Sequence, residues 1–319
     1  MSSSTSSFRT EVKVVVMVAV VLAACELCVR LFERRLAVDM QTPAISKRLA
    51  EGEGRHVLVL GNSLVRDGVK TGILEAEMRA QGTGPISVER VHLRNTIVND
   101  WYYVFKHHFI DAGRPPDALV LCFAAHYLRD ISIQRPLVAR YHSSLRDVPR
   151  IFTDDVPDFD GRIEFLLSAW SASFTHRADV ERRMLDALIP HYREAALRVN
   201  RFLEDEALRK RPANYQPTYR GLERLVRMAK DHGVRLILVA LPVKSPYAID
   251  PEIMRIVETE GIALIDSRSV DGLGEESYVD EIHMNSDAAA IYSRFLARRL
   301  ADYFKQNPIG EAFLPLAED

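Results

Sequence analysis

Four short segments that are apolar at nearly every position constrain the fold of this chain more than any other feature. They lie at residues 56–61, 117–124, 234–242 and 262–267. Such runs are typical of strands that are buried on both faces, as in a parallel sheet covered by helices. Segments with helical periodicity alternate with the strands or follow them, at 69–81, 99–113, 219–233, 251–261 and 285–306. With a further strand expected at 86–93, the pattern predicts an α/β protein with a central parallel sheet.

One region interrupts this alternation. Residues from about 128 to 216 are rich in Arg, Asp and Pro and contain helical patches such as 178–207. We expect them to form an insertion over the edge of the sheet or over the carboxyl ends of its strands. The main α/β domain is therefore expected over residues 50–319, with this insertion inside it, and residues 1–36 are expected to form an N-terminal tail and anchor.

The N-terminal segment has the composition of a membrane helix. An uninterrupted apolar run extends from Val14 to Cys25. A spanning helix needs about 20 mostly apolar residues, and this length is reached only if Glu26 and Arg30 lie at the membrane surface. We interpret the segment as an uncleaved signal anchor because apolar residues continue beyond Cys25.

Two other interpretations of the N-terminus stay open. Residues 22–25, Leu-Ala-Ala-Cys, resemble a lipobox, which would make the segment a lipoprotein signal. A buried helix of the main domain is the third interpretation. Basic residues stand on both sides of the apolar run, so the positive-inside rule does not set its orientation. They are Arg9 and Lys13 before the run and Arg30, Arg34 and Arg35 after it.

Composition excludes some classes of function. The formal net charge of −2 gives no electrostatic basis for binding nucleic acid. The three cysteines have no zinc-type spacing. The adjacent His107 and His108 diverge on a helix and are not expected to share a metal ion. Neither a metal nor a cofactor is implied.

The first apolar strand ends in a way that suggests chemistry. It stops at Gly61, and Asn62 and Ser63 follow. In an open α/β sheet, active sites lie in the crevice where loops leave the carboxyl ends of the strands, so a serine at this place reaches that crevice. The alternative is a plain strand-to-helix turn in which Ser63 caps the helix.

A second polar pattern lies just before the last helix. Asp280 and His283 are three residues apart, and in one helical turn such groups lie on the same side. A carboxylate there can hold one ring nitrogen of the histidine while the other takes a proton from a serine. That is the division of roles in a Ser-His-Asp triad. The alternative is an acidic first turn of the helix with an incidental histidine.

These two blocks resemble those of the SGNH (GDSL-like) hydrolase superfamily. Its first block is a strand followed by G-D-S, and its last block is D-x-x-H before the C-terminal helix. Here they read Gly61-Asn62-Ser63 and Asp280-Glu281-Ile282-His283. The resemblance spans about residues 55–305, apart from the middle insertion. It implies a flavodoxin-like three-layer α/β/α fold with Ser63 as nucleophile, His283 as general base and Asp280 as the residue that orients His283.

The chain departs from the family at the oxyanion hole. The family uses the backbone N–H of the serine, a glycine from a second block and an asparagine from a third. Counting along the segment after Pro116 places Ala124 at the glycine of the third block and His126 at its asparagine. The second block has no glycine and offers Asn95 instead. By the resemblance, Asn62, Asn95 and His126 are the expected oxyanion or substrate-binding residues.

The resemblance implies a serine esterase or O-acyltransferase that acts on acyl esters, such as acetyl esters, of an envelope or extracellular polysaccharide. Membrane-anchored proteins that resemble this superfamily are often associated with the modification of envelope polysaccharides. This association suggests the polysaccharide substrate, a single-pass anchor and a periplasmic or otherwise extracytoplasmic domain. The expected partners are the substrate and the membrane, and any envelope assembly partners are unidentified. The alternative is a non-catalytic scaffold or binding subunit of a polysaccharide assembly that kept the fold. The aromatic residues at 101–103 and 105 are expected in the core rather than stacked on a sugar.

Overall fold

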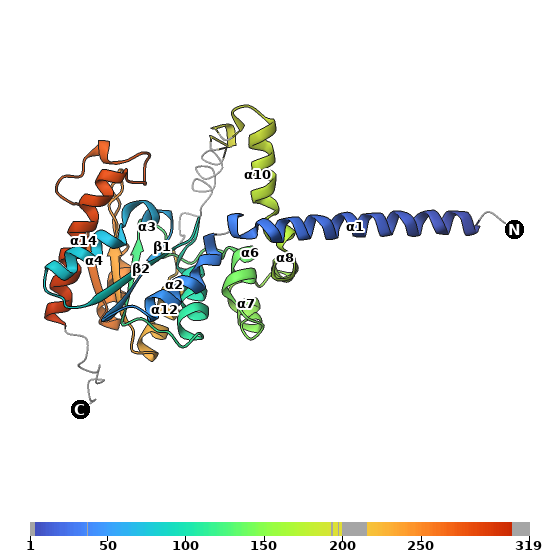
Figure 1. Ribbon diagram of the computed structural model, residues 1–319. Coiled ribbons are helices and arrows are strands. Elements are labelled where there is room, and N and C mark those ends of the chain that lie inside the picture. The colour runs from blue at the N-terminus through green and yellow to red at the C-terminus, as the bar shows by residue number, and fades with distance from the viewer. Residues whose placement is uncertain (1–3, 37, 193, 197, 200–215, 308–319) are drawn as a thin grey trace. The chain divides into compact units, whose positions relative to one another are not determined.

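The computed structural model describes residues 4–36, 38–192, 194–196, 198–199 and 216–307 (Figure 1). Parts of the expected insertion, at 193, 197 and 200–215, lie outside the described residues, as do the ends of the chain at 1–3 and 308–319. The chain divides into two compact units. The first consists of residues 1–40, 135–141 and 149–216, and the second of residues 41–134, 142–148 and 217–319.

The second unit contains a five-stranded sheet in which every neighbouring pair of strands is parallel. Its strands are β1 (Arg55–Gly61), β2 (Ile86–His92), β3 (Ala118–Phe123), β4 (Arg235–Ala240) and β5 (Ala263–Asp266). The order β2-β1-β3-β4-β5 is that of flavodoxin-like proteins. The predicted α/β fold class with a central parallel sheet is therefore confirmed. The order reverses between β1 and β3, which places the crevice for a ligand beside the end of β1.

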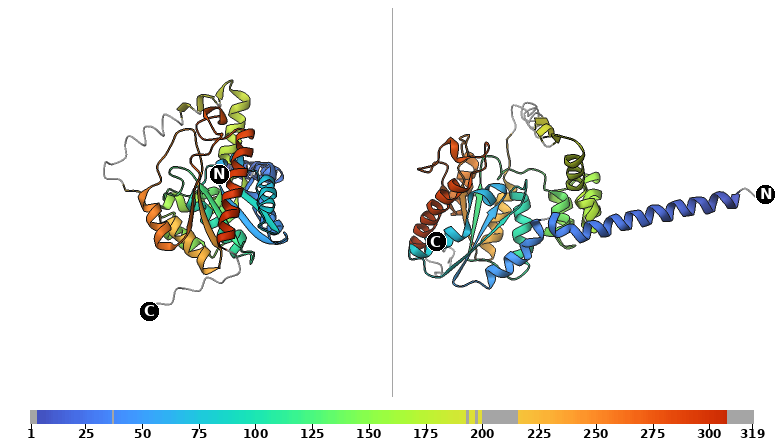
Figure 2. Two further views of the ribbon diagram at one scale, coloured as in Figure 1. Left: turned by 90° about the vertical axis from the view of Figure 1, so that its left-hand side faces the viewer. Right: turned by 45° about the horizontal axis from the view of Figure 1, so that its top comes forward.

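Helices cover both faces of this sheet. Helices α4 and α14 lie together on one side, and α2, α5 and α12 lie on the other (Figure 1); Figure 2 shows the same sheet from two further directions. The helical elements of the unit are α2 (Thr42–Ala50), α3 (Ser63–Gly68), α4 (Thr71–Ala80), α5 (Val98–Phe105), the π-helical segment η2 (Lys106–Ile110), α12 (Arg220–Asp231), α13 (Pro251–Glu260), the 3₁₀ segment η4 (Glu275–Ser277) and α14 (Ser286–Gln306). The three-layer arrangement implied by the family resemblance is thus present.

The burial of the strands explains the apolar runs in the sequence. Val57 and Val59 point into a core shared with α4 and α14, whereas Leu58 and Leu60 are equally buried but lie outside that core. Because successive side chains of a strand point to opposite faces, both faces of β1 must be apolar. The aromatic residues of α5, namely Trp101, Tyr102, Tyr103 and Phe105, are all buried, which confirms their assignment to the core.

The first unit is helical. Its complete helices are α1 (Ser4–Leu36), α6 (Arg135–Leu137), α8 (Phe159–Trp170), α9 (Ala172–Thr175) and α10 (Arg177–Leu188). It also includes all but one residue each of the 3₁₀ segment η1 (Val38–Gln41), the π-helical segment η3 (Val138–His142) and the helix α7 (Val148–Asp154). Within α1, the candidate span Thr10–Glu33 has 24 residues, and its most apolar window of 18 residues has a mean hydropathy of 2.6 with no residue buried. By length and composition this stretch can cross a membrane.

Two details of the expected helices differ from the structure. Residues 99–113 do not form one α-helix, because α5 ends at Phe105 and continues as the π-helical segment η2. The short helix α3 was not expected as a separate element. It occupies the six residues that directly follow the turn at Asn62.

Gly61 provides a test of the packing at the end of β1. A Cβ atom on this residue would lie 2.5 Å from Val65 Cγ2 and 3.0 Å from the carbonyl oxygen of Cys122. We expect Gly61→Ala to lower the free energy of unfolding by about 1–3 kcal/mol, the usual cost of overpacking a core. Gly72→Ala is the matched control, since nothing lies within 4 Å of a Cβ there. It should leave stability unchanged or raise it by up to about 1 kcal/mol. Equal denaturant midpoints for the two variants would contradict the prediction.

Candidate active site

The turn after β1 leaves the Ser63 hydroxyl available. Asn62 is the N-cap of α3, because its Oδ1 accepts a hydrogen bond from Leu64 N at 3.0 Å. Its Nδ2 donates to the Thr96 carbonyl oxygen at 3.4 Å. The alternative in which Ser63 caps the helix is therefore wrong. Ser63 is the first residue of α3, and its side chain is not consumed by capping.

The segment that carries Asp280 and His283 is a closed loop. Tyr278 and Met284 form an antiparallel bridge, and Val279 N donates to the His283 carbonyl oxygen at 2.9 Å. The expectation that Asp280 and His283 share a helical turn is wrong, because α14 begins only after its N-cap at Asn285. The bridge, rather than a helix, brings the two side chains together.

Packing between α3 and α14 fixes this loop beside Ser63. A Cβ on Gly68 would be in ordinary contact with the Met284 sulfur, at 3.5 Å, so the end of α3 lies against the loop. Ser293 of α14 accepts a hydrogen bond from Lys70 N at 2.8 Å. The Lys70 ammonium also donates to Ser286 Oγ at 2.7 Å. The two segments, more than 200 residues apart in sequence, are held together by these contacts.

Ser63, His283 and Asp280 form a continuous chain of hydrogen bonds. The distance between Ser63 Oγ and His283 Nε2 is 2.8 Å, and the distance between His283 Nδ1 and Asp280 Oδ2 is also 2.8 Å. The other carboxylate oxygen of Asp280 accepts from the backbone N–H groups of Ile282 at 2.9 Å and His283 at 2.8 Å. With Nδ1 protonated, His283 can donate to Asp280 and receive a proton from Ser63 at Nε2.

The electrostatics favour an ionised Asp280. Partial burial would raise the pKa of this carboxyl group, but hydrogen bonds from the Ile282 N–H and from His283 outweigh burial and hold the pKa below its usual value. Asp280 therefore stays negatively charged beside the imidazole, which stabilises the imidazolium that forms when His283 accepts a proton.

A second carboxylate, Asp67, was missed from the sequence. Its Oδ2 lies 3.9 Å from His283 Nε2, on the serine side of the ring. Two hydrogen bonds from Arg66, at 2.7 and 2.6 Å, together with its charge, hold the pKa of Asp67 below its usual value. The spacing from Ser63 to Asp67 is i, i+4, so a helix after the turn would have placed both on one face. The expected helix began only at residue 69, so this signal was not used.

The loops after β1, β2 and β3 meet at the same edge of the sheet. The bond from Asn62 to Thr96 joins the first two loops, and Val98 N donates to the Tyr127 carbonyl oxygen at 3.0 Å, which joins the second and third. Asn95 and His126 lie on these loops with exposed side chains. Their expected roles as oxyanion donors, and that of Asn62, stay predictions.

The backbone N–H of Ser63 stands at the first position of α3. It has no hydrogen-bond acceptor among the residues that the structure describes. The first N–H groups of a helix have no partner within the helix, so they can donate hydrogen bonds to a negatively charged atom and stabilise it. An oxyanion that forms on the carbon attacked by Ser63 would lie next to this group.

A cluster elsewhere in the second unit has the composition of a metal site. His107, Asp111 and Asp147 each offer one ligand atom, and these three atoms lie within 4.8 Å of one another. The ammonium group of Lys106 donates to Asp111 at 2.7 Å and lies 2.8 Å from Asp147. This positive charge stands where a cation would be attracted, so we assign no metal to the cluster.

No protein-family model and no curated protein matches this chain. Among solved structures, it is similar to a G-D-S-L family protein from Desulfitobacterium hafniense, with 10% identity, a TM-score of 0.37 and coverage of 76% of this chain and 97% of that one. A lipase/acylhydrolase from Enterococcus faecalis has 12% identity and a TM-score of 0.37, with coverage of 78% and 97%. A variant of an acetyl xylan esterase from Geobacillus stearothermophilus has 13% identity and a TM-score of 0.39, with coverage of 78% and 95%.

At TM-scores of this size, these similarities add nothing to the argument. The fold assignment rests on the strand order and the layers of the second unit. The candidate active site rests on the hydrogen bonds between Ser63, His283 and Asp280.

The lowered pKa of Asp280 predicts how acid affects stability. Its pKa is lower in the folded chain than in the unfolded chain, so the unfolded chain takes up the proton first as the pH falls. The stabilisation from ionised Asp280 is therefore complete above the ordinary aspartate pKa of about 3.9 and is lost as the pH falls toward the lower folded value. Asp280→Asn lacks this contribution. We expect the difference between its denaturant midpoint and that of the parent to shrink from pH 5 to pH 3. A constant difference over this range would contradict the assignment.

Proposed function

We propose that this protein is a membrane-tethered serine ester hydrolase or O-acyltransferase of SGNH type, with Ser63 as its nucleophile. The observation that supports this most directly is the pair of 2.8 Å hydrogen bonds that links Ser63 to His283 and His283 to Asp280. Ser63 lies near the start of the second unit's sequence, and Asp280 and His283 lie near its end. Ser63 is half-buried at the carboxyl end of β1. Ligands bind at this edge in open α/β sheets.

The reaction begins when Ser63 Oγ attacks the carbonyl carbon of the acyl ester and His283 Nε2 takes the hydroxyl proton. Asp280 keeps the imidazolium in place through its bond to Nδ1. The oxyanion of the tetrahedral intermediate lies near the Ser63 N–H. When the intermediate collapses, His283 returns the proton to the departing alkoxide, and the acyl group stays on Ser63. Water or a sugar hydroxyl then gives its proton to His283 and attacks the acyl-enzyme, which releases the acid or the new ester and restores Ser63.

Asp67 adds a negative charge to the same site. Its carboxylate is 3.9 Å from His283 Nε2, too far for a direct hydrogen bond. Arg66 neutralises part of this charge. We therefore assign Asp67 an electrostatic role at most, and Asp280 remains the residue that orients His283.

The substrate and the location follow from the family resemblance. Anchored proteins of this type are associated with the modification of envelope polysaccharides, so we propose an acetyl-like ester on such a carbohydrate as the substrate. The apolar stretch Thr10–Glu33 supports a single-pass anchor, and a periplasmic or otherwise extracytoplasmic catalytic domain is part of the same proposal.

One observation favours a second candidate, a non-catalytic scaffold or binding subunit of a polysaccharide assembly. The chain has no glycine in the second block, and it has His126 where the family resemblance leads one to expect the asparagine of the third block. The loss of one oxyanion donor typically costs about 10²–10³-fold in rate. A chain that lost two donors could keep its fold and its triad without useful turnover.

The first test replaces the proposed nucleophile. In the full-length protein, Ser63→Ala should lower turnover of p-nitrophenyl acetate by about 10³-fold or more, because no acyl-enzyme can form. Ser87→Ala is the matched control. Its hydroxyl donates to the Glu53 carbonyl oxygen at the amino end of β2, away from the site, and activity should be unchanged.

A serine-reactive phosphonate separates the two candidate functions. We expect one phosphonyl adduct on Ser63 by intact-mass and peptide analysis, and none in Ser63→Ala. A folded parent that gains no adduct and hydrolyses no ester would favour the scaffold. Equal activity of the parent and Ser63→Ala would refute the assignment of the nucleophile.

The second test concerns the oxyanion hole. If His126 donates to the oxyanion, His126→Ala should lower the rate of acylation by about 10²-fold. His126→Asn should retain most of the rate, because an amide N–H replaces the imidazole N–H. Stopped-flow measurement of the acylation burst gives the rate directly. A parent-like burst in folded His126→Ala would show that the donor lies elsewhere, and Asn95→Ala would then be the next variant to measure.

A further inference from the structure

Helix α8 in the first unit exposes a continuous apolar face. Phe159 and Trp170, at its two ends, are 74% and 79% exposed. The apolar side chains between them on the same face are Ile163, Leu166 and Leu167, which are also exposed. Their spacing of i, i+4, i+7, i+8 and i+11 is that of one side of an α-helix. The opposite side carries Gly161, Phe165 and Ser168, which are buried. An exposed stripe of this kind on a packed helix indicates a surface that an apolar partner covers.

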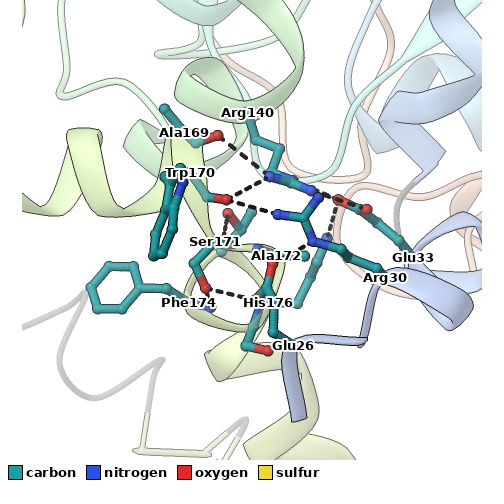
Figure 3. A network of polar contacts seen from close by, with 12 residues as sticks. Glu26, Arg30, Glu33, Arg140, Ala169, Trp170, Ser171, Ala172, Phe174 and His176 are labelled. Carbon is teal, nitrogen blue, oxygen red and sulfur yellow. Dashed lines mark hydrogen bonds and ion pairs between the residues drawn. The ribbon is translucent and has the colours of Figure 1, made fainter. Parts of the chain in front are cut away.

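The end of α8 is attached to α1 by hydrogen bonds (Figure 3). The Glu26 carboxylate accepts from Ser171 Oγ at 2.8 Å, from Ala172 N at 2.9 Å and from Ser173 N at 3.0 Å. Arg30 donates to Glu26 at 2.7 Å and to the Trp170 carbonyl oxygen at 3.0 Å. The connection between α8 and α9 therefore lies directly against residues 26–30 of α1.

A second carboxylate fixes the same face of α1 further along. Glu33 is buried and accepts from Arg140 Nε at 2.6 Å and from the Tyr141 hydroxyl at 2.7 Å. Glu26 and Glu33 are two helical turns apart, so both point the same way. Within the first unit, the last two turns of α1 before Glu33 are thus held by partners from residues 140–141 and 170–173.

The length of α1 sets the depth of these contacts in a membrane. The uninterrupted apolar run from Val14 to Cys25 extends only about 18 Å at 1.5 Å per residue. The hydrocarbon core of a bilayer is about 30 Å thick. A helix that begins its span near Thr10 therefore leaves the core close to Arg30, after about 20 residues. Arg30 and the Trp170 carbonyl bonded to it would lie at the boundary of the bilayer, with Glu26 one helical turn before it.

We propose that the exposed face of α8 lies in the boundary between headgroups and acyl chains, in the leaflet at which α1 leaves the membrane. This rests on the membrane tether of the proposed function. The bilayer is the partner that the geometry favours, because the α8 face ends at Trp170, beside a helix whose apolar residues are themselves exposed from Val12 to Leu31. Tryptophan is enriched at this boundary, and helices with exposed Trp, Phe and Leu on one face lie in it. The first unit then has two attachments to the membrane, a spanning helix and a helix in the membrane plane.

The two tryptophans of the chain make the proposal directly testable. Trp170 is 79% exposed, whereas Trp101 is completely buried in the second unit. The full-length protein is reconstituted into phosphatidylcholine vesicles that contain lipids brominated close to the headgroup. We expect these lipids to quench part of the parent's tryptophan emission and to quench Trp170→Phe, which retains only Trp101, far less.

A pair of variants tests whether the α8 face causes the quenching. Ile163→Glu combined with Leu166→Glu should lift the face toward water and remove most of the quenching, without loss of helical circular dichroism, because both side chains are exposed. Met254→Glu is the control and changes a partly exposed apolar residue of α13 in the second unit. The brominated lipids should quench its tryptophan emission as much as that of the parent.

Three outcomes would overturn the proposal. Equal quenching of the parent and Trp170→Phe would remove Trp170 from the bilayer. Quenching of Trp170 by aqueous iodide in the same vesicles would place the face in water, and protection from both quenchers would indicate a protein partner or a second copy. Flotation of the protein with vesicles after an alkaline wash reports the tether separately. Hydrolysis of p-nitrophenyl acetate reports the candidate active site, so failure of the proposed function is distinguishable from failure of this inference.

Discussion

The hydrogen bond between Ser63 Oγ and His283 Nε2 joins residues 220 positions apart, and the rest of the candidate site depends on it. It requires the last residue of β1 to be a glycine, so that Val65 and the Cys122 carbonyl can approach the backbone of Gly61. It also requires the loop at 278–284 to close on itself and to pack against α3. The parallel sheet provides both conditions, because the strand order places β1 next to the reversal point and α14 against α3 and α4.

The sequence predicted the sheet well because helices cover it on both sides. Each strand must then be apolar at successive positions, as at Val57 and Leu58, and such a signal is local. The short helix α3 gave no such signal, because six residues are too few to show a period. The loop that holds Asp280 and His283 was assigned to a helical turn for a related reason. Its geometry comes from the bridge between Tyr278 and Met284, which is a contact that spacing alone does not reveal.

The choice between capping and catalysis at the first turn also depends on the tertiary structure. Asn62 and Ser63 are both good N-cap residues, so the sequence leaves either possible. In the structure Asn62 caps α3 and donates to Thr96, which frees the Ser63 hydroxyl for His283. The backbone course of the loops that carry Asn95 and His126 could not be predicted from the sequence, because each loop contains a residue other than glycine with a positive φ. Asn95 and Ala125 adopt positive φ values of 53° and 46°.

The charged residues of α1 show how tertiary contacts change the meaning of a hydropathy pattern. From the sequence, Glu26 and Arg30 are charges that must reach the membrane surface by themselves. In the structure they bind residues about 140 positions later, and Glu26 receives three hydrogen bonds besides the one from Arg30. A carboxylate satisfied in this way loses much less on leaving water than an isolated one. The same bonds make the end of α1 a packed element of the first unit rather than a flexible tether. The proposed anchor would then restrict the tilt of the unit to which it belongs, and this restriction is what the proposed placement of α8 at one depth requires.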